Sequence, residues 1–433
     1  MNIWCDRVVD ADGVRERVRF THAGGLVAAV ETDVAPRGDD VVLGTVIPGV
    51  ANAHSHAFHR VLRGRTHAHG GDFWRWRESM YAAAARLDPE SYFELARAVF
   101  AEMVTSGYTA VGEFHYVHHR QDGTPYPHEM ERAVAAAAES VGIRLTLLDT
   151  AYLTGGIDRP LAPKQERFSD GSAGAYLDRW HELRDRVGHG ARLGAAVHSV
   201  RAVPRDAIAQ IAAGLTADVP LHVHLSEQPQ ENADSVAAYG LTPTELLSEA
   251  GVLSARATAV HATHLTGGDI ALLGEAGASI VMCPTTEADL GDGIGPAREL
   301  LSAGARLAVG SDQNAVVDPF LETRGLEMHE RLAHGARGRF APAEILRAAT
   351  DDGYRSLGWQ VAPLQPGGPC DLVEIDAASA RTLGSHPTEL MLTATAADAR
   401  RVIVGGHTVA SRGRLADGTS PAQLLHDALR RFP

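Results

Sequence analysis

The chain has 433 residues, of which 45% are hydrophobic and 22% are charged. This composition is typical of a globular protein and excludes a disordered or collagen-like chain. The length accommodates an α/β barrel of about 250 residues beside a smaller domain. The net charge of −14 has the wrong sign for general electrostatic binding of nucleic acid or anionic membranes. We therefore expect neither as a partner.

Targeting and cysteine patterns predict a cytoplasmic protein without a disulfide framework. No run approaches the roughly 18 unbroken apolar residues of a spanning helix, and the first residues show no basic region followed by an apolar core. The three cysteines, Cys5, Cys283 and Cys370, are widely spaced and form no CxxC pair. Any metal site must therefore use histidine and carboxylate ligands.

The first elements in chain order are β-like. Residues 1–47 contain short apolar segments separated by turn-forming Asp-Gly and Gly-Gly pairs, which predicts a small β region. From Pro48 onward, apolar strand-like runs alternate with helical patterns, as is typical of βα units around a parallel sheet. The clearest helix is expected to run from Asp88 to Ser106, because Asp88 can cap it and Pro89 suits its first turn.

Eight alternating units favour a closed (β/α)8 TIM barrel over an open doubly wound sheet. An open sheet of that kind would need a glycine-rich phosphate loop, which the sequence lacks. The strands are expected to be the segment ending at 54–56 and the segments 109–114, 143–150, 192–197, 219–225, 257–261, 279–283 and 306–310.

After the last predicted helix, 342–359, the pattern becomes β-like again between 365 and 413. A small β-sandwich domain built from both chain ends, 1–47 and 361–433, is therefore expected to flank the barrel. The barrel itself, over 48–360, is expected to be the catalytic domain.

Polar residues interrupt the apolar pattern where the predicted strands end. In a barrel these ends share the carboxyl-terminal rim, where such folds build their active sites. The residues are His54 and His56 on the first strand, Glu113, His115 and Tyr116 on the second, His198 on the fourth, His224 and Glu227 on the fifth, His261 and His264 on the sixth, and Asp312 on the eighth.

The HxH pair His54 and His56 places two imidazoles on one face of an extended strand. With a third histidine and a carboxylate from distant strand ends, the pair matches the ligand set that Zn²⁺ or Fe²⁺ accepts with an open position for water. His222 and His224 form a second HxH pair, and spacing leaves open which of the two binds metal. A packed core histidine is the alternative for His222.

These residues resemble the amidohydrolase superfamily, in its mononuclear deaminase branch. The resemblance rests on HxH on strand one, HxxE at 224–227, a histidine on strand six and Gly-Ser-Asp at 310–312. More narrowly, several stretches resemble the formimidoylglutamate deiminases of histidine breakdown. They are NAHSHAF (52–58), GDFWRWRESMY (71–81), EFHYVHH (113–119), HSVRAVP (198–204), HLSEQ (224–228), VHATHL (260–265) and GSD (310–312).

The resemblance implies an amidohydrolase-type barrel that converts N-formimidoyl-L-glutamate and water to N-formyl-L-glutamate and ammonia. Carried over by position, it implies the metal ligands His54, His56, His224 and Asp312. It also implies Glu227, His261 and Asp312 as catalytic proton-transfer residues, and substrate contacts from His59, Arg77, Tyr116, His198 and Arg201. His59 is a departure, because a family member has glutamine at this position, which is expected to touch the carboxylate end of the substrate.

One divalent metal ion per chain is expected, Zn²⁺ first and Fe²⁺ as the alternative. Dinuclear relatives use a carboxylated lysine at the end of strand four, where this chain has His198, and its only lysine, Lys164, lies in the preceding loop. Zinc lowers the pKa of a bound water to about 7. Asp312 and His261 would take the proton of this water, and Glu227 would protonate the leaving nitrogen.

Two other functions fit parts of the same pattern. A related deaminase could act on a nucleobase or another amidine, but the planar forks of Arg77 and Arg201 suit a dicarboxylate substrate better. A catalytically dead barrel that serves as a binding protein should have lost a metal or proton-transfer residue, and none is missing. We also expect a homodimer. The loop histidines expected at the surface are His67, His69, His118, His119 and His128.

Overall fold

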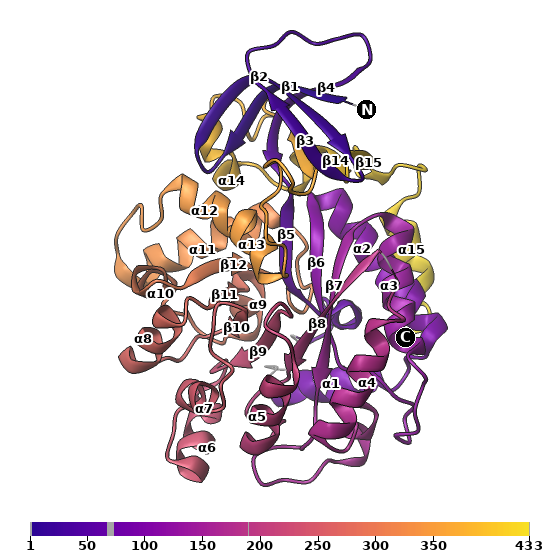
Figure 1. Ribbon diagram of the computed structural model, residues 1–433, viewed down its shortest axis with the longest axis vertical. Coiled ribbons are helices and arrows are strands. Elements are labelled where there is room, and N and C mark those ends of the chain that lie inside the picture. The colour runs from indigo at the N-terminus through magenta and orange to yellow at the C-terminus, as the bar shows by residue number, and fades with distance from the viewer. Residues whose placement is uncertain (1, 67–72, 189, 433) are drawn as a thin grey trace.

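The computed structural model describes residues 2–66, 73–188 and 190–432. Two eight-stranded sheets organise these residues, one parallel and one mostly antiparallel, and helices surround the parallel sheet (Figure 1). Within this part of the chain no helix is long and apolar enough to cross a membrane. His67 and His69 lie outside the described residues.

The predicted barrel is confirmed, with its strands hydrogen-bonded in chain order. Most strand residues are buried, because the strands are covered by side chains inside the barrel and by helices outside it. The strands are β5 (Val50–Ser55), β6 (Tyr108–His115), β7 (Arg144–Ala151), β8 (Ala191–Val197), β9 (Leu221–Leu225), β10 (Ala257–His261), β11 (Ser279–Met282) and β12 (Arg306–Val309).

The barrel closes between β12 and β5 at residues predicted to bind metal. The backbone N–H of His56 donates to the carbonyl of Asp312 at 2.9 Å, and the N–H of Asp312 donates to the carbonyl of His54 at 3.0 Å. Behind this seam the Asn52 side chain accepts from the Ser311 N–H at 2.9 Å and donates to the Ser311 hydroxyl at 2.6 Å. The hydrogen bonds that close the barrel therefore also place three of the predicted ligands.

Helices connect the barrel strands. The described α-helices of this region are α1 (Phe73–Ala84), α2 (Pro89–Ser106), α3 (Glu129–Val141), α4 (Ala173–Arg184), α5 (Arg205–Gly214), α6 (Pro229–Tyr239), α7 (Pro243–Glu249), α8 (Gly267–Glu275), α9 (Pro284–Leu290), α10 (Ala297–Ala303), α11 (Pro319–His334), α12 (Pro342–Ala349) and α13 (Asp351–Ser356). Short 3₁₀ helices η1 (Ala57–Leu62) and η2 (Pro163–Phe168) lie in the loops.

Helix α2 begins and ends as the sequence predicts. The Asp88 carboxylate accepts from the Ser91 N–H at 2.8 Å, and the Ser91 hydroxyl accepts from the Asp88 N–H at 2.9 Å, which is a capping box. Gly107 follows with a φ of +114°, a conformation that favours glycine over residues with a Cβ.

Both chain ends contribute to the second sheet, so the indigo and yellow segments lie side by side in Figure 1. Its order is β16-β15-β14-β13-β4-β1-β2-β3. Its strands are β1 (Asn2–Asp10), β2 (Gly13–Ala23), β3 (Leu26–Glu31), β4 (Asp40–Pro48), β13 (Leu372–Ile375), β14 (Ala399–Val404), β15 (His407–Ser411) and β16 (Arg414–Leu415). The flanking β unit expected from the two termini is thus one continuous sheet.

A buried aspartate ties this sheet to the barrel. Asp371 accepts from Arg144 at 2.5 and 2.9 Å, from the Tyr354 hydroxyl at 2.6 Å and from the Gly405 N–H at 2.7 Å. Because Arg144 is the first residue of β7, the sheet packs at the amino-terminal end of the barrel, opposite the rim where the strands end.

Two predicted elements near the end of the chain differ from the structure. The helix expected over 342–359 breaks into α12 and α13 at Thr350, whose backbone is not helical, with a φ of −114° and a ψ of −90°. The β-like stretch 365–413 contains helical segments between β13 and β14. These are η3 (Pro387–Glu389), α14 (Leu390–Thr393) and η4 (Ala396–Asp398), and α15 (Pro421–Leu429) follows β16.

The prediction that His118, His119 and His128 lie at the surface is wrong, since all three are buried. His128 packs at the start of α3 with Nε2 3.5 Å from Glu182. His119 Nε2 donates to Asp170 at 3.0 Å. The sequence indicated loops here, but a loop histidine becomes buried when distant acidic residues fold over it.

His118 belongs to a buried charged cluster between β6, β7, α3 and α4. His118 Nδ1 donates to Glu131 at 2.8 Å, and Arg179 donates to Glu131, Asp149 and Asp170 at 3.2, 2.9 and 2.7 Å. Asp149 and Glu131 raise the pKa of His118, although burial and the charge of Arg179 act to lower it. His115, His118, Glu131 and Asp149 are close enough to hold a metal ion, but Arg179 already supplies positive charge to their carboxylates.

Replacing Arg179 by Met should lower the free energy of unfolding by about 3–5 kcal/mol, because it leaves buried carboxylates without their cation. Urea unfolding measures this loss. Arg186→Met is the matched control, since Arg186 is an exposed partner of Glu182 at 3.9 Å and should contribute about 0–1 kcal/mol. Equal, small effects of both changes would contradict a stabilising role for the cluster.

Candidate metal centre and active-site pocket

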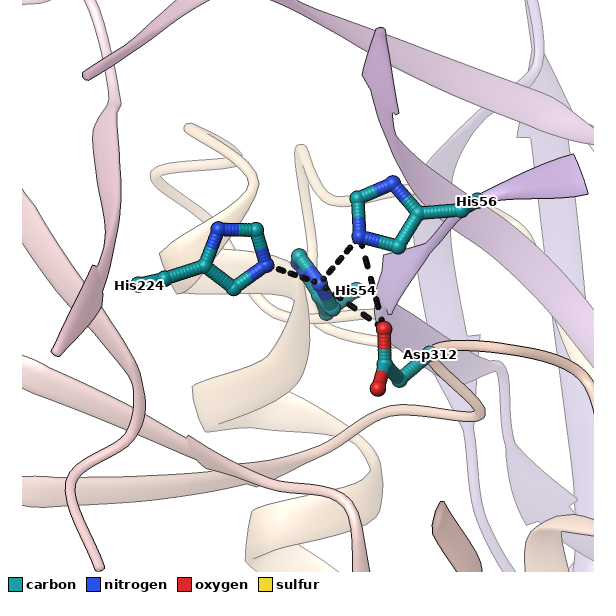
Figure 2. Close-up of side chains that lie close together, drawn as sticks. All are labelled: His54, His56, His224 and Asp312. Carbon is teal, nitrogen blue, oxygen red and sulfur yellow. Dashed lines mark hydrogen bonds and ion pairs between the residues drawn. The ribbon is translucent and has the colours of Figure 1, made fainter. Parts of the chain in front are cut away.

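All four predicted ligands converge at the carboxyl-terminal rim (Figure 2). His54 Nε2 lies 3.1 Å from His56 Nε2, 3.2 Å from His224 Nε2 and 3.3 Å from Asp312 Oδ1. All four side chains are buried, and their ligand atoms lie within 4.8 Å of one another. The structure also distinguishes the two members of the second HxH pair. His224 lies with the other ligands, whereas His222 donates from Nε2 to the Ser356 carbonyl at 2.8 Å.

The protonation of these histidines fits a metal ion. His56 donates from Nδ1 to the Phe114 carbonyl at 3.0 Å and His224 from Nδ1 to the His198 carbonyl at 2.9 Å. Burial lowers the pKa values of His54, His56 and His224, so each imidazole is neutral and the Nε2 atoms of His56 and His224 carry lone pairs. A single N–H on His54 Nε2 can satisfy only one of the acceptors around it. A divalent cation satisfies all of them, and histidine with carboxylate is a set that Zn²⁺ and Fe²⁺ accept.

Strained backbone turns aim these side chains. His261 and Asp312 have φ values of +69° and +41°, and Ser226 and Asn314 are also in the left-handed region. Such conformations cost non-glycine residues about 1–3 kcal/mol each and cluster at functional sites. At the Asp312 turn, Asn314 Nδ2 donates to the carbonyls of His56 and Asp312 at 3.0 and 3.2 Å, which offsets part of that cost.

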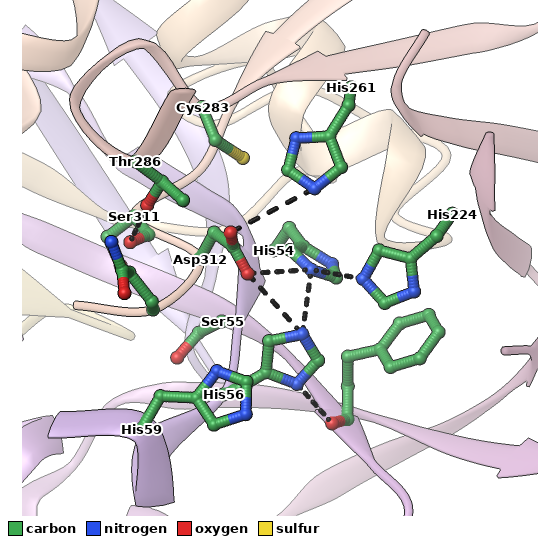
Figure 3. A network of polar contacts seen from close by, with 12 residues as sticks. His54, Ser55, His56, His59, His224, His261, Cys283, Thr286, Ser311 and Asp312 are labelled. Carbon is green, nitrogen blue, oxygen red and sulfur yellow. Dashed lines mark hydrogen bonds and ion pairs between the residues drawn. The ribbon is translucent and has the colours of Figure 1, made fainter. Parts of the chain in front are cut away.

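His261 and Glu227 lie beside the four ligands (Figure 3 shows His261 facing Asp312). His261 Nε2 is 3.9 Å from both Asp312 Oδ2 and Glu227 Oε1. His261 Nδ1 donates to Glu287 at 3.3 Å, and Glu287 also accepts from the Cys283 N–H at 2.8 Å. The charge of Glu227 and the hydrogen bond to Glu287 raise the pKa of His261 to about 10, although burial acts to lower it. His261 is therefore held protonated between carboxylates.

Sequence reasoning missed Glu287. It lies on α9, 26 residues beyond His261, where it reads as an ordinary acidic residue of a first helical turn. Only the packing of α9 against the end of β10 brings the two side chains together.

A cavity of about 210 Å³ opens beside the four ligands. Every predicted site residue lines it except the fully buried His54. Three of the predicted substrate-binding residues touch one another or a neighbouring aromatic ring. His59 Nε2 is 3.0 Å from the Tyr116 hydroxyl, and the His198 ring packs edge-on against Tyr152 at 4.7 Å. Burial lowers the pKa of His59 to about 3, so His59 takes part as a neutral imidazole.

The two predicted arginines also face this cavity. Arg77, on α1, donates from Nε to the Tyr81 hydroxyl at 2.8 Å. Arg201 lies between two carboxylates, with Nη2 3.4 Å from Glu227 Oε2 and Nε 3.2 Å from Glu231 Oε2. Glu231 is a second site residue that sequence reasoning missed.

The remaining wall is mostly aromatic or apolar, comes from both helices and loops, and also includes Arg159. Gln165, on η2, donates to the hydroxyls of Tyr81 and Tyr152 at 3.0 and 2.7 Å. This contact anchors the long segment 152–170 against the cavity. The residues of this wall come from separate parts of the chain, with Trp76, Met80 and Tyr81 on α1, Phe168 on η2 and Leu290 on α9. They include Trp76, Met80, Tyr81, Tyr152, Phe168 and Leu290.

Comparisons with known proteins agree with the fold. The chain is 38% identical over 391 residues to the formimidoylglutamate deiminase of Pseudomonas aeruginosa, covering 86% of each chain. It is 32% identical to the 8-oxoguanine deaminase of the same species, over 83% of this chain and 81% of that one.

Solved structures give the same result. An amidohydrolase from Brucella melitensis is 33% identical, with a TM-score of 0.93 over 99% of both chains. An adenosine deaminase from Xanthomonas campestris with bound zinc is 27% identical, with a TM-score of 0.84 over 99% of this chain and 97% of that one.

The amidohydrolase family model matches residues 45–409, a range that contains the complete barrel and every residue of the site. The chain therefore belongs to the amidohydrolase family and is a hydrolase that acts on carbon–nitrogen bonds.

Proposed function

We propose that this deaminase-type amidohydrolase hydrolyses N-formimidoyl-L-glutamate to N-formyl-L-glutamate and ammonia. The observation that carries the proposal is the presence of two arginines, Arg77 and Arg201, in the same small cavity as the four ligands. Guanidinium groups bind carboxylates through paired hydrogen bonds, and a dicarboxylate matches two of them. The similarity to the P. aeruginosa formimidoylglutamate deiminase supports the same substrate.

We further propose that His54, His56, His224 and Asp312 hold one divalent cation, Zn²⁺ first and Fe²⁺ as the alternative. When bound, such a cation supplies Lewis-acid activation of water near neutral pH. Zinc is supported by the zinc-containing adenosine deaminase of similar fold. A single ion is supported by the position of Lys164, whose ammonium pairs with exposed Glu78 away from the end of β8.

Proton transfer is assigned to the residues around the ligands. Asp312 Oδ2 faces the protonated His261, so Asp312 can take the proton from the attacking water while His261 orients that water. Glu227 lines the cavity and can carry a proton to the nitrogen that leaves as ammonia, because an amidine nitrogen leaves poorly unless protonated. Tyr116, His198 and His59 line the cavity as neutral hydrogen-bonding groups and would hold the rest of the substrate.

A second candidate is deamination of an oxidised purine. The similarity to the P. aeruginosa 8-oxoguanine deaminase and the aromatic wall formed by Tyr116, Tyr152 and Phe168 favour a flat ring. The two arginines oppose it, because a neutral ring offers their guanidinium groups no carboxylate to bind.

Glu227→Gln should lower kcat by roughly 10²–10⁴ and leave the metal content unchanged. The amide keeps the shape of the side chain but cannot carry the proton. Ammonia release and metal analysis of the same preparation test this. Activity within a few-fold of the original protein would mean that the leaving nitrogen receives its proton from another group.

Arg77→Met and Arg201→Met should each lower kcat/KM for formimidoylglutamate by roughly 30-fold to several thousand-fold, which corresponds to about 2–5 kcal/mol for a lost buried charge partner. Much of the loss should appear in KM, since the carboxylates lie away from the reacting carbon.

An uncharged formimidoyl compound, turned over slowly by the original protein, should be little affected by these changes. Arg298→Met is the matched control, because Arg298 pairs with Glu344 at 3.0 Å and does not line the cavity. Equal losses on both compounds would require withdrawal of the dicarboxylate assignment. His59→Gln should keep the preference for formimidoylglutamate.

A further inference from the structure

Glu231 is a buried carboxylate on the cavity wall that the chemistry above does not use. It lies in the first turn of α6 and is only 1% exposed. Neither of its oxygens has a well-aligned hydrogen bond within the described part of the chain, but Oε2 lies 3.2 Å from Arg201 Nε. Taking a carboxylate out of water without a strong partner is costly, so Arg201 must be its main counter-charge.

Arg201 joins Glu231 to the proposed proton carrier. Its guanidinium lies 3.2 Å from Glu231 and 3.4 Å from Glu227, and its side chain is 23% exposed, into the cavity. The charge of Glu231, and to a lesser extent that of Glu227, raises the pKa of Arg201, although burial acts to lower it. Burial raises the pKa of Glu231 to about 7, with Arg201 acting against that rise. One cation thus serves two carboxylates, of which Glu231 is the closer.

This arrangement resolves a conflict within the site. Arg201 must bind a substrate carboxylate while Glu227 stays available to move a proton. If Glu227 were the only nearby carboxylate, the two groups would form a tight pair, and both would be removed from their tasks. A second, buried carboxylate that holds Arg201 from the wall side weakens this competition.

We propose that Glu231 is a positioning residue that holds Arg201 for the substrate carboxylate and keeps it from pairing fully with Glu227. The proposal rests on the proposed function, because it assumes a substrate with a carboxylate at Arg201. It assigns Glu231 no contact with substrate. Its effect must pass entirely through Arg201.

The test is a double-mutant cycle on the metal-loaded protein with Glu231→Gln, Arg201→Met and the double variant. Calorimetry measures the Kd of the product, N-formyl-L-glutamate, and of its neutral diamide, and ammonia release gives KM and kcat. Glu231→Gln should weaken binding of the charged product by ~10-fold, which is about 1.4 kcal/mol. It should raise KM and lower kcat for formimidoylglutamate and leave binding of the diamide unchanged. The double variant should bind no more weakly than Arg201→Met alone.

Glu330→Gln is the matched control, because Glu330 is also 1% exposed and pairs with an arginine, Arg339, at 3.1 Å outside the cavity. It should leave both Kd values unchanged. If Glu231→Gln folds poorly, Glu231→Asp keeps the charge but retracts it, and should give a smaller loss in the same direction.

Two results would overturn the proposal. One is equal weakening of the charged and neutral ligands by Glu231→Gln. The other is additive losses in the double variant, which would mean that Glu231 acts independently of Arg201. If the original protein neither binds the product nor releases ammonia from formimidoylglutamate, the proposed function fails instead, and the cycle separates the two failures.

Discussion

The site depends on the convergence of ligand atoms with unpaired electrons in a buried space at the seam of the barrel. The Nε2 atoms of His54, His56 and His224 and a carboxylate oxygen of Asp312 lie within 4.8 Å of one another, and four of these pairs are 3.1–3.4 Å apart. Neutral imidazoles and a carboxylate at these distances repel unless a cation lies among them. The hydrogen bonds that close the barrel hold this arrangement, so the fold itself keeps the ligands together.

The surroundings of the ligands are arranged by charge. Carboxylates surround a protonated His261 on one side, and on the other Arg77, Arg159 and Arg201 line a cavity whose wall also includes several aromatic rings. In a protein with a net charge of −14, attraction for an anionic substrate must come from such local cations. The cluster around Arg179, beside the loop that carries Tyr116, shows the same principle away from the cavity. There, one buried arginine balances several carboxylates.

The barrel and most of the candidate site were predictable because both follow local rules. Apolar runs ending in His54, His224 or Asp312 indicate strands that open into a shared rim. Other features depend on helices packed from elsewhere in the chain. They are the burial of His118, the pairing of His261 with Glu287 and the contact of Arg201 with Glu231. Their residue types look like ordinary loop or helix positions. The choice between His222 and His224 likewise depends on which carbonyl each ring reaches.

The metal ligands and the arginines together support the proposal that one metal ion held at this seam directs hydrolysis toward a formimidoyl dicarboxylate. Its most direct test is ammonia release from N-formimidoyl-L-glutamate, its aspartate analogue and 8-oxoguanine, measured on one preparation whose metal content is known. We expect one transition metal per chain and preferred turnover of formimidoylglutamate. Exhaustive chelation should abolish this activity, and one equivalent of Zn²⁺ should restore it. Preferred turnover of 8-oxoguanine, two metals per chain or full activity after chelation would contradict this proposal.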